Sequence, residues 1–315
     1  MNSMWPEAEW DVSGAFANDR ELIAFFDFCK NRLGFEPFHL VHGAPLCTWN
    51  SGRVVKQLLR EAEELRAAGL AYEQRNIAVY LTFSNLMLKE EHLDDLLGHA
   101  LCKFLVRHNP TKRNGVILAN ELLLNRLRKD YPELRYISSI LNVTYMGGKG
   151  KLDTYKRLAE QFDEVMVHPD DVFNYDFLEK IEDKDRHILL VNEYCIRNCP
   201  LRALHYKTLS ENSLDFLGHD GRDFDARQAN NGCRDVVGMI INDKYGVLAL
   251  STPEIQRLYD MGFRHFKLQG RGHTNGSLIL FELIRLALRN DASHENRMHA
   301  VAQRFWETLS SPEYQ

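Results

Sequence analysis

The sequence predicts a (β/α)8 barrel, an α/β fold in a single domain with a C-terminal helical extension. Short apolar runs alternate along the 315-residue chain with amphipathic segments of helical period. Strands that alternate with helices pair in parallel through right-handed crossovers. The chain also has no early glycine-rich phosphate loop, which an open nucleotide-binding sheet would carry. Eight strand–helix units in this length therefore favour a closed barrel.

Each predicted strand is an apolar run bounded by polar or turn-forming residues. The eight runs cover 38–43, 77–84, 115–120, 136–142, 164–169, 187–194, 245–251 and 263–272. We expect the barrel to span 36–290, after a helical lead-in at 1–35. A helix at 291–315 is expected to pack on the barrel.

The predicted helices carry apolar residues three and four positions apart, and several begin at a capping residue such as Ser51 or Thr252. They cover 51–70, 90–108, 120–132, 153–162, 170–181 and 252–262. From 207 to 235, polar and turn-forming residues dominate without a period. This predicts a long loop of the kind that covers a functional site.

Composition excludes several classes of protein. The net charge of −5 supplies no general basic field, so nucleic acid is not the expected partner. The N-terminus has no signal-peptide pattern, and no apolar run is long enough to span a membrane. We therefore expect a cytoplasmic protein, in which six cysteines favour metal or redox chemistry over disulfides.

Polar side chains follow the predicted strands at their carboxyl ends, where barrel enzymes carry their active sites. His42, Glu193 and His205 are the candidates for proton transfer. Basic side chains suit a carboxylate-bearing small molecule, since arginine offers a bidentate fork and lysine a point charge. The candidates for binding it are Asn120, Asn142, His168, Arg197, Arg202, Lys267, Gln269 and Arg271.

Four cysteines fall in loops on the same predicted face. Cys195 and Cys199 flank a short turn, Cys233 ends the long loop, and Cys47 follows the first predicted strand. Four thiolates from three loops can hold a 4Fe-4S cluster or, alternatively, a zinc ion. Cys29 and Cys102 lie within helical apolar patterns and are expected in the core.

The segment GVLALSTPEIQRLYDMGFRHFKLQGRG (246–272) resembles the closing part of the collagenase-like peptidase U32 family. The family's Lys-x-Glu-Gly-Arg-like motif stands here as Lys267-Leu268-Gln269-Gly270-Arg271, and VNEYCIRNCPLRALHY (191–206) is similar to its cluster-bearing members. The resemblance covers about residues 36–290. It implies a barrel, a 4Fe-4S cluster and oxygen-independent hydroxylation.

These patterns lead to a functional hypothesis with open alternatives. The first is an iron–sulfur barrel enzyme that oxidises or hydroxylates a small molecule without oxygen. The alternative is a non-catalytic cluster-bearing partner, working with a second barrel subunit or as a homodimer, or a redox sensor. RNA-base hydroxylation and a zinc-dependent hydrolase or peptidase have less support, since the sequence shows neither a basic domain nor a zinc-protease helix.

Overall fold

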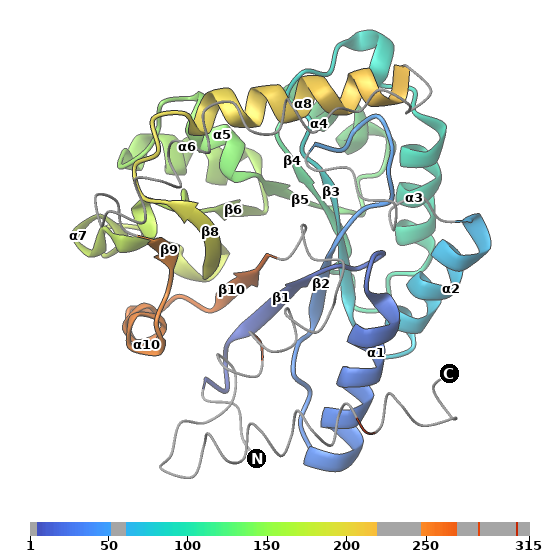
Figure 1. Cartoon of the computed structure of the whole chain (residues 1–315), viewed down its shortest axis with the longest axis horizontal. Helices are drawn as coiled ribbons and strands as arrows, with labels where there is room; N and C mark the ends of the chain where they lie inside the picture. The colour runs from blue at the N-terminus through green and yellow to red at the C-terminus, as the bar shows by residue number, and fades with distance from the viewer. Residues whose placement is uncertain (1–4, 52–60, 219–246, 270–282, 284–306, 308–315) are drawn as a thin grey trace.

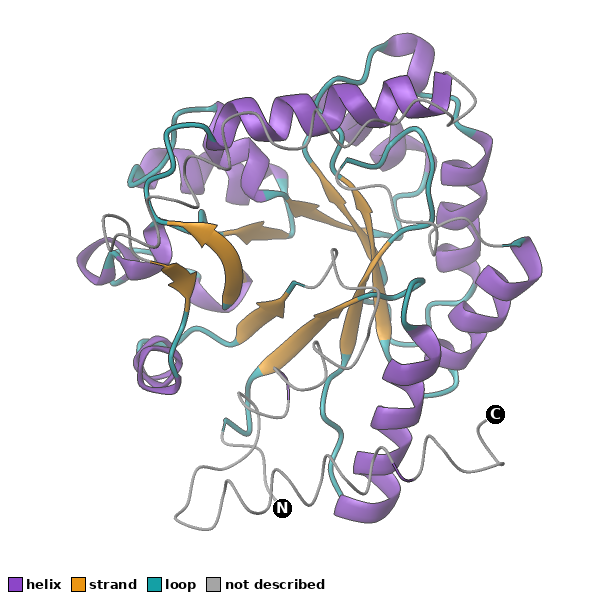
Figure 2. Cartoon of the chain, in the orientation of Figure 1, coloured by secondary structure: helices purple, strands orange, loops and turns teal. Residues whose placement is uncertain are grey.

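The protein is an eight-stranded parallel barrel surrounded by helices. The computed structural model describes residues 5–51, 61–218 and 247–269, together with Leu283 and Glu307. The strands close in the order β1-β10-β7-β6-β5-β4-β3-β2, and every neighbouring pair is parallel. The strands occupy the centre of Figure 2 with helices around them. The predicted (β/α)8 barrel is therefore confirmed.

The barrel strands are β1 (Glu9–Ser13), β2 (Leu40–Gly43), β3 (Ala78–Phe83), β4 (Gly115–Leu118), β5 (Arg135–Ser138), β6 (Glu164–Met166), β7 (His187–Leu190) and β10 (His265–Leu268). The helices between them are α1 (Asp19–Phe28), α2 (Ala62–Glu73), α3 (Leu96–Arg107), α4 (Glu121–Asp130), α5 (Ile140–Tyr145), α6 (Leu152–Gln161), α7 (Tyr175–Leu178), α8 (Arg202–Gly218) and α10 (Thr252–Asp260). Figure 1 shows α8 running along one side of the molecule, past α5 and α4.

The sequence prediction placed one barrel strand wrongly. The segment 245–251 contains β9 (Val247–Ala249), which pairs antiparallel with β8 (Asn192–Ile196) in a separate two-stranded sheet. The barrel strand missing from the prediction is β1, which lies inside the expected helical lead-in. Residues 9–13 alternate between polar and apolar side chains, and this alternation is the period of a strand with two different faces.

The expected long loop is also shorter than predicted at its start. Residues 207–218 continue α8, whereas 219–235 lie outside the described residues, as does almost all of the C-terminal helix expected at 291–315. The carbonyl of Ser210 in α8 accepts a hydrogen bond from Asn85 Nδ2 at 3.1 Å. This contact fixes the helix to the loop after β3, beside the carboxyl ends of the strands.

Two apolar layers build the core. A small inner cluster fills the barrel, and a larger outer cluster lies between the strands and the helices. The inner cluster comprises Leu40, Ala78, Tyr80, Ile117, Ile137, Met166 and Ile188. Alternation along each strand sends one set of side chains inward and the other outward, as in other barrels of this type. In the described part of the chain, no helix is long and apolar enough to cross a membrane.

Candidate active site at the barrel mouth

Asp11 organises the charged side chains inside the barrel. It lies in the middle of β1, directly opposite Lys267 of β10, and its side chain is fully buried. Asp11 Oδ2 accepts a hydrogen bond from Lys267 Nζ at 2.7 Å, and Asp11 Oδ1 lies 2.5 Å from His42 Nδ1. One carboxylate therefore holds a lysine and a histidine from its two neighbouring strands.

The electrostatics of this triad favour an ionised Asp11. Burial by itself would raise the pKa of the Asp11 carboxyl, but the charges of His42 and Lys267 and the hydrogen bond from His42 outweigh it. The pKa of Asp11 therefore lies well below its usual range. Because an ionised carboxylate only accepts, His42 donates from Nδ1 in its neutral and its protonated form alike, and Nε2 is the ring nitrogen that gains or loses the proton.

His42 and Lys267 line a cavity of about 40 Å³ at the carboxyl ends of the strands. Its walls differ in character. One side, from β10 through β1 to β3, is polar and comprises His42, Thr82, Ser84, Lys267 and Gln269. The other, from β4 to β7, is mainly apolar and comprises Ile117, Ile140, Met166, Ile188 and Leu190, with Ser139 after β5 among them. A cavity with convergent polar groups at this end of a barrel has the position and character of an active site.

Gln269 is held in this wall by β8. The side-chain amide of Asn192 brackets the Gln269 backbone, accepting from its N–H at 2.8 Å and donating to its carbonyl at 2.9 Å. Glu193 Oε1 accepts a hydrogen bond from Gln269 Nε2 at 2.7 Å. Glu193 is thus placed beside the cavity as the partner of Gln269.

The structure gives several other predicted site residues structural contacts. Asn120 caps α4 through Leu123 N–H, and Asn142 donates to the carbonyl of Leu118 at 3.0 Å. His205 lies in α8, its ring stacked with that of Tyr206. Arg197 lies over the ring of Phe173 at 3.3 Å. None of these four predicted residues lines the mouth cavity, and Arg271 lies outside the described residues.

His168 and Arg202 meet at Asp170, in a second buried cluster on the loop after β6. Arg202 Nη2 lies 3.4 Å from Asp170 Oδ1, and Asp170 N–H donates to His168 Nδ1 at 3.2 Å. Asp170 Oδ1 also accepts from Asn198 N–H at 2.8 Å. Asp170 therefore anchors the turn between Cys195 and Cys199.

Among the predicted cysteine ligands, Cys47 has a buried thiol. Cys47 is 3% exposed within the outer apolar core, with Asp95 and Cys102 among the groups near its thiol. Burial raises the pKa of the Cys47 thiol, which disfavours the thiolate that a metal needs. Cys47 thus lies in the loop after β2, as expected, with its side chain buried in the outer core.

Two candidate ligands lie in β8 and in the turn that follows it. Cys195 is in β8, and Cys199 is a partly exposed free thiol near the start of α8. Cys233 lies outside the described residues. Within the described ranges, no three His, Cys, Asp or Glu side chains form a group that could hold a metal ion. The core positions expected for Cys29 and Cys102 are confirmed by their complete burial.

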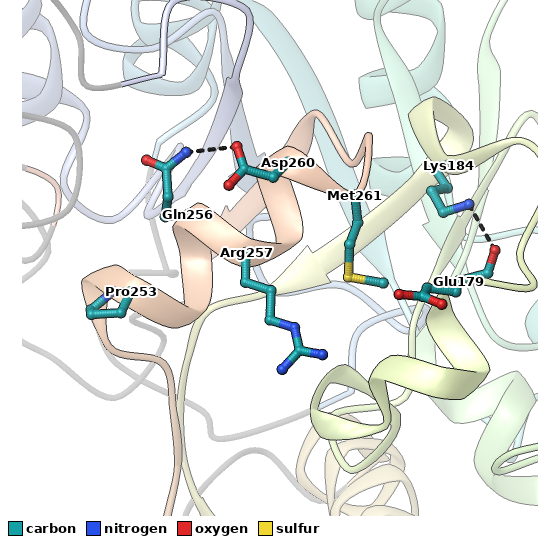
Figure 3. A pocket seen from close by; sticks show the side chains of 7 residues that line it. All are labelled: Glu179, Lys184, Pro253, Gln256, Arg257, Asp260 and Met261. Atoms are coloured by element: carbon teal, nitrogen blue, oxygen red, sulfur yellow. Dashed lines mark hydrogen bonds between the residues drawn. The ribbon is translucent and has the colours of Figure 1, made fainter.

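A separate groove lies on the outer surface between α10 and the segment after α7. Its volume is about 480 Å³, and it is lined by Glu179, Lys184, Pro253, Gln256, Arg257, Asp260 and Met261. Figure 3 shows two hydrogen bonds among its residues: Gln256 donates to Asp260 at 2.8 Å, and Lys184 donates to the Glu179 carbonyl at 3.1 Å. The groove lies outside the barrel, away from the carboxyl ends of the strands. The barrel mouth is the better candidate for chemistry.

Comparison with solved structures shows a likeness at the level of the fold. The structure of the U32 peptidase Mk0906 superposes with a TM-score of 0.52 at 12% identity, covering 86% of this chain and 94% of that chain. The chain shares the fold of a U32 peptidase. A GH18 chitinase from Pseudoalteromonas aurantia is also similar, with a TM-score of 0.46 at 12% identity over 87% of this chain and 98% of that one. No protein-family model matches the sequence, and no curated protein is similar to it.

Sequence reasoning missed Asp11, which holds His42 and Lys267, and cavity residues that include Thr82. Asp11 was hidden in the expected lead-in, and Thr82 is a single hydroxyl in a run treated as apolar. The alternation of Glu9, Asp11 and Ser13 with Trp10 and Val12 is the signal that could have revealed β1. That pattern puts Asp11 on the inner face of a strand, where an ionised carboxylate needs partners.

Proposed function

We propose that the chain is an enzyme that performs acid–base chemistry on a small carboxylate-bearing molecule at the barrel mouth. The observation that carries the proposal is the double contact of Asp11 with His42 and Lys267, both of which line the cavity. A carboxylate that orients a histidine through Nδ1 leaves Nε2 to take or give a proton.

The two cavity side chains have different tasks. Lys267 supplies positive charge to a ligand carboxylate, and its ion pair with the fully buried Asp11 favours the charged ammonium. His42 is the proton acceptor, and the Asp11 carboxylate stabilises the imidazolium that forms. Gln269 adds an amide held in place by Glu193.

The test uses proton NMR in D₂O with a panel of short oxo and hydroxy acids. We expect line broadening that reports binding, and loss of C–H signals next to a carbonyl that reports proton transfer. Lys267→Gln should abolish both, whereas His42→Gln should keep the binding and lose the exchange. Lys89→Gln is the control, because the side chain of Lys89 is 73% exposed. Exchange that persists in His42→Gln, or a panel that never binds, would refute the proposal.

A second proposal is that a 4Fe-4S cluster serves oxygen-independent oxidation or hydroxylation at the same mouth. The observation that favours it is the position of Cys195, two residues after Glu193, which pairs with the cavity residue Gln269. Cys195, Cys199 and Cys233 would hold the cluster, and the cluster would exchange electrons with a bound molecule. Since Cys47 is buried in the outer core, this proposal takes its ligands from the other three candidate cysteines.

Anaerobic purification with iron, sulfide and zinc quantification tests this second proposal. We expect iron and sulfide in equal amounts, and their loss in Cys195→Ser and Cys199→Ser. Cys47→Ala should retain them. One zinc without sulfide would support the structural-zinc alternative. Retention of the iron in Cys199→Ser would exclude that thiol as a ligand. A cluster that is present while the His42-dependent exchange is absent would favour the non-catalytic partner or redox sensor.

A further inference from the structure

Two buried hydroxyl groups near His42 lack hydrogen-bond partners. Thr82 Oγ1 and Ser13 Oγ have none among the described residues. Thr82 is 8% exposed and Ser13 is 0% exposed, so bulk solvent does not satisfy them. Because nearly all buried polar groups in native proteins are hydrogen-bonded, each unsatisfied one needs an explanation such as a water or a ligand.

Strand register places both hydroxyls around His42. Ser13 of β1 lies directly opposite His42 of β2, which lies opposite Tyr80 of β3. Thr82 follows Tyr80 by two positions and therefore shares its face. Thr82 and His42 both line the mouth cavity. A ligand group that exchanges a proton with His42 therefore lies in the same cavity as the Thr82 hydroxyl.

The opposite wall of the cavity restricts the rest of the ligand. Five apolar side chains from β4, β6, β7 and the start of α5 dominate it, with the hydroxyl of Ser139 after β5 among them in the cavity lining. The cavity of about 40 Å³ is small, so a ligand that enters it is short. A ligand that satisfies both walls carries its polar groups on one side and an aliphatic body on the other.

We infer that the mouth selects a short hydroxy or oxo acid with an aliphatic body. In this inference, Thr82 is the residue that recognises the hydroxyl or oxo oxygen of the acid, as distinct from its carboxylate. This inference rests on the proposed function, in which Lys267 binds the carboxylate. The ligand hydroxyl accepts a hydrogen bond from Thr82 Oγ1 and faces His42. An oxo group at the same carbon accepts the same bond.

The experiment compares two acids that differ only by the hydroxyl. Isocaproate and its hydroxy derivative, the hydroxy-acid analogue of leucine, are titrated by calorimetry into the wild type, Thr82→Val and Thr82→Ser. We expect the wild type to bind the hydroxy acid about tenfold more tightly, the effect of one neutral hydrogen bond. Thr82→Val should lose this preference while its affinity for isocaproate stays unchanged, and Thr82→Ser should keep the preference.

The outcomes separate this inference from the function on which it rests. Equal binding of the two acids by the wild type overturns the inference and leaves the carboxylate site intact. If Thr82→Val keeps the preference for the hydroxy acid, the role of Thr82 is overturned. It is also overturned if Thr82→Val and Thr82→Ser both lose the binding of both acids. Binding of neither acid, together with no response from the wider panel of acids, overturns the inference and the proposed function together.

Discussion

Asp11 is the residue on which the candidate site depends. Removing one partner of a buried ion pair leaves the other charge without compensation, and this typically costs about 3–5 kcal/mol. We therefore expect Asp11→Asn to lower the free energy of unfolding by about 3–5 kcal/mol, measured by urea denaturation at neutral pH. The charge left without a compensating partner is the ammonium of Lys267, whose side chain is 9% exposed.

A double-mutant cycle checks whether this cost belongs to the pair. Lys267→Met should destabilise the protein by a similar amount, because it leaves Asp11 buried and ionised. The double variant Asp11→Asn/Lys267→Met should lose less than the sum of the two single changes, because it buries no uncompensated charge. Simple additivity would show that the contact at 2.7 Å contributes nothing specific to stability.

His168 predicts a dependence of stability on pH. Burial lowers its pKa from 6.5 to about 4, so the folded protein keeps the ring neutral while the unfolded chain protonates it. The free energy of unfolding should therefore fall as the pH drops from about 6.5 to about 4, by up to about 3 kcal/mol. Above pH 6.5 this contribution is fully present.

The variant His168→Gln should make that slope shallower in denaturation curves recorded between pH 4 and 7. Part of the slope remains, since the pKa of His187 is also lowered by burial. Asp11 and Asp170, whose pKa values are lowered, lose their stabilisation only below the usual carboxyl range, so the fall in stability below about pH 4 should persist. An unchanged slope between pH 4 and 7 would contradict the buried, neutral state of His168.

At the scale of elements, the turn between β8 and α8 depends on one carboxylate. Asp170 accepts the Asn198 N–H at 2.8 Å and lies 3.1 Å from Lys149 Nζ. Asn198 has a φ of 56°, a left-handed conformation that needs such support. Asp170→Asn removes the charge that pairs with Lys149 and Arg202, and it weakens the acceptor of the Asn198 N–H. We therefore expect a looser turn and a faster alkylation of Cys199, as followed by mass spectrometry.

Asp176→Asn is the matched control, since Asp176 is an exposed aspartate in the neighbouring α7. We expect it to leave the alkylation of Cys199 unchanged. If Asp170→Asn and Asp176→Asn gave equal rates, the turn would be fixed by contacts other than Asp170.

The elements differ in how far the sequence could predict them. Helices such as α4 and α10 carry a periodic apolar face and a capping residue, so local information locates them. β1 contains the ionised Asp11, whose burial becomes favourable only through His42 and Lys267, up to 256 positions away in sequence. β9 is an apolar run like any barrel strand, and only its antiparallel pairing with β8 excludes it from the barrel. The site shows the same limit of local information. The ends of the predicted strands indicated the positions of His42, Lys267 and Gln269, but not the position of Asp11, which contacts both His42 and Lys267.

At the scale of the whole molecule, β1 closes the barrel. It pairs with β2 on one side and with β10 on the other, so the sheet has no edge only while β1 is in place. It also buries Trp10 and Val12 in the outer core. Without β1, two strand edges would be open to pairing with other chains, and open edges of this kind lead to aggregation.

We therefore predict that deletion of residues 1–13 abolishes cooperative folding. The loss of one barrel strand with its hydrogen bonds and its buried side chains should exceed the whole stability of a typical domain, about 5–15 kcal/mol. Circular dichroism during thermal unfolding and size-exclusion chromatography measure the outcome. Deletion of residues 1–4 is the control and should unfold cooperatively as a soluble species, because it leaves β1 intact. A soluble, cooperatively unfolding protein without residues 1–13 would show that the other seven strands form a stable sheet by themselves, and that Asp11 lies in an accessory strand.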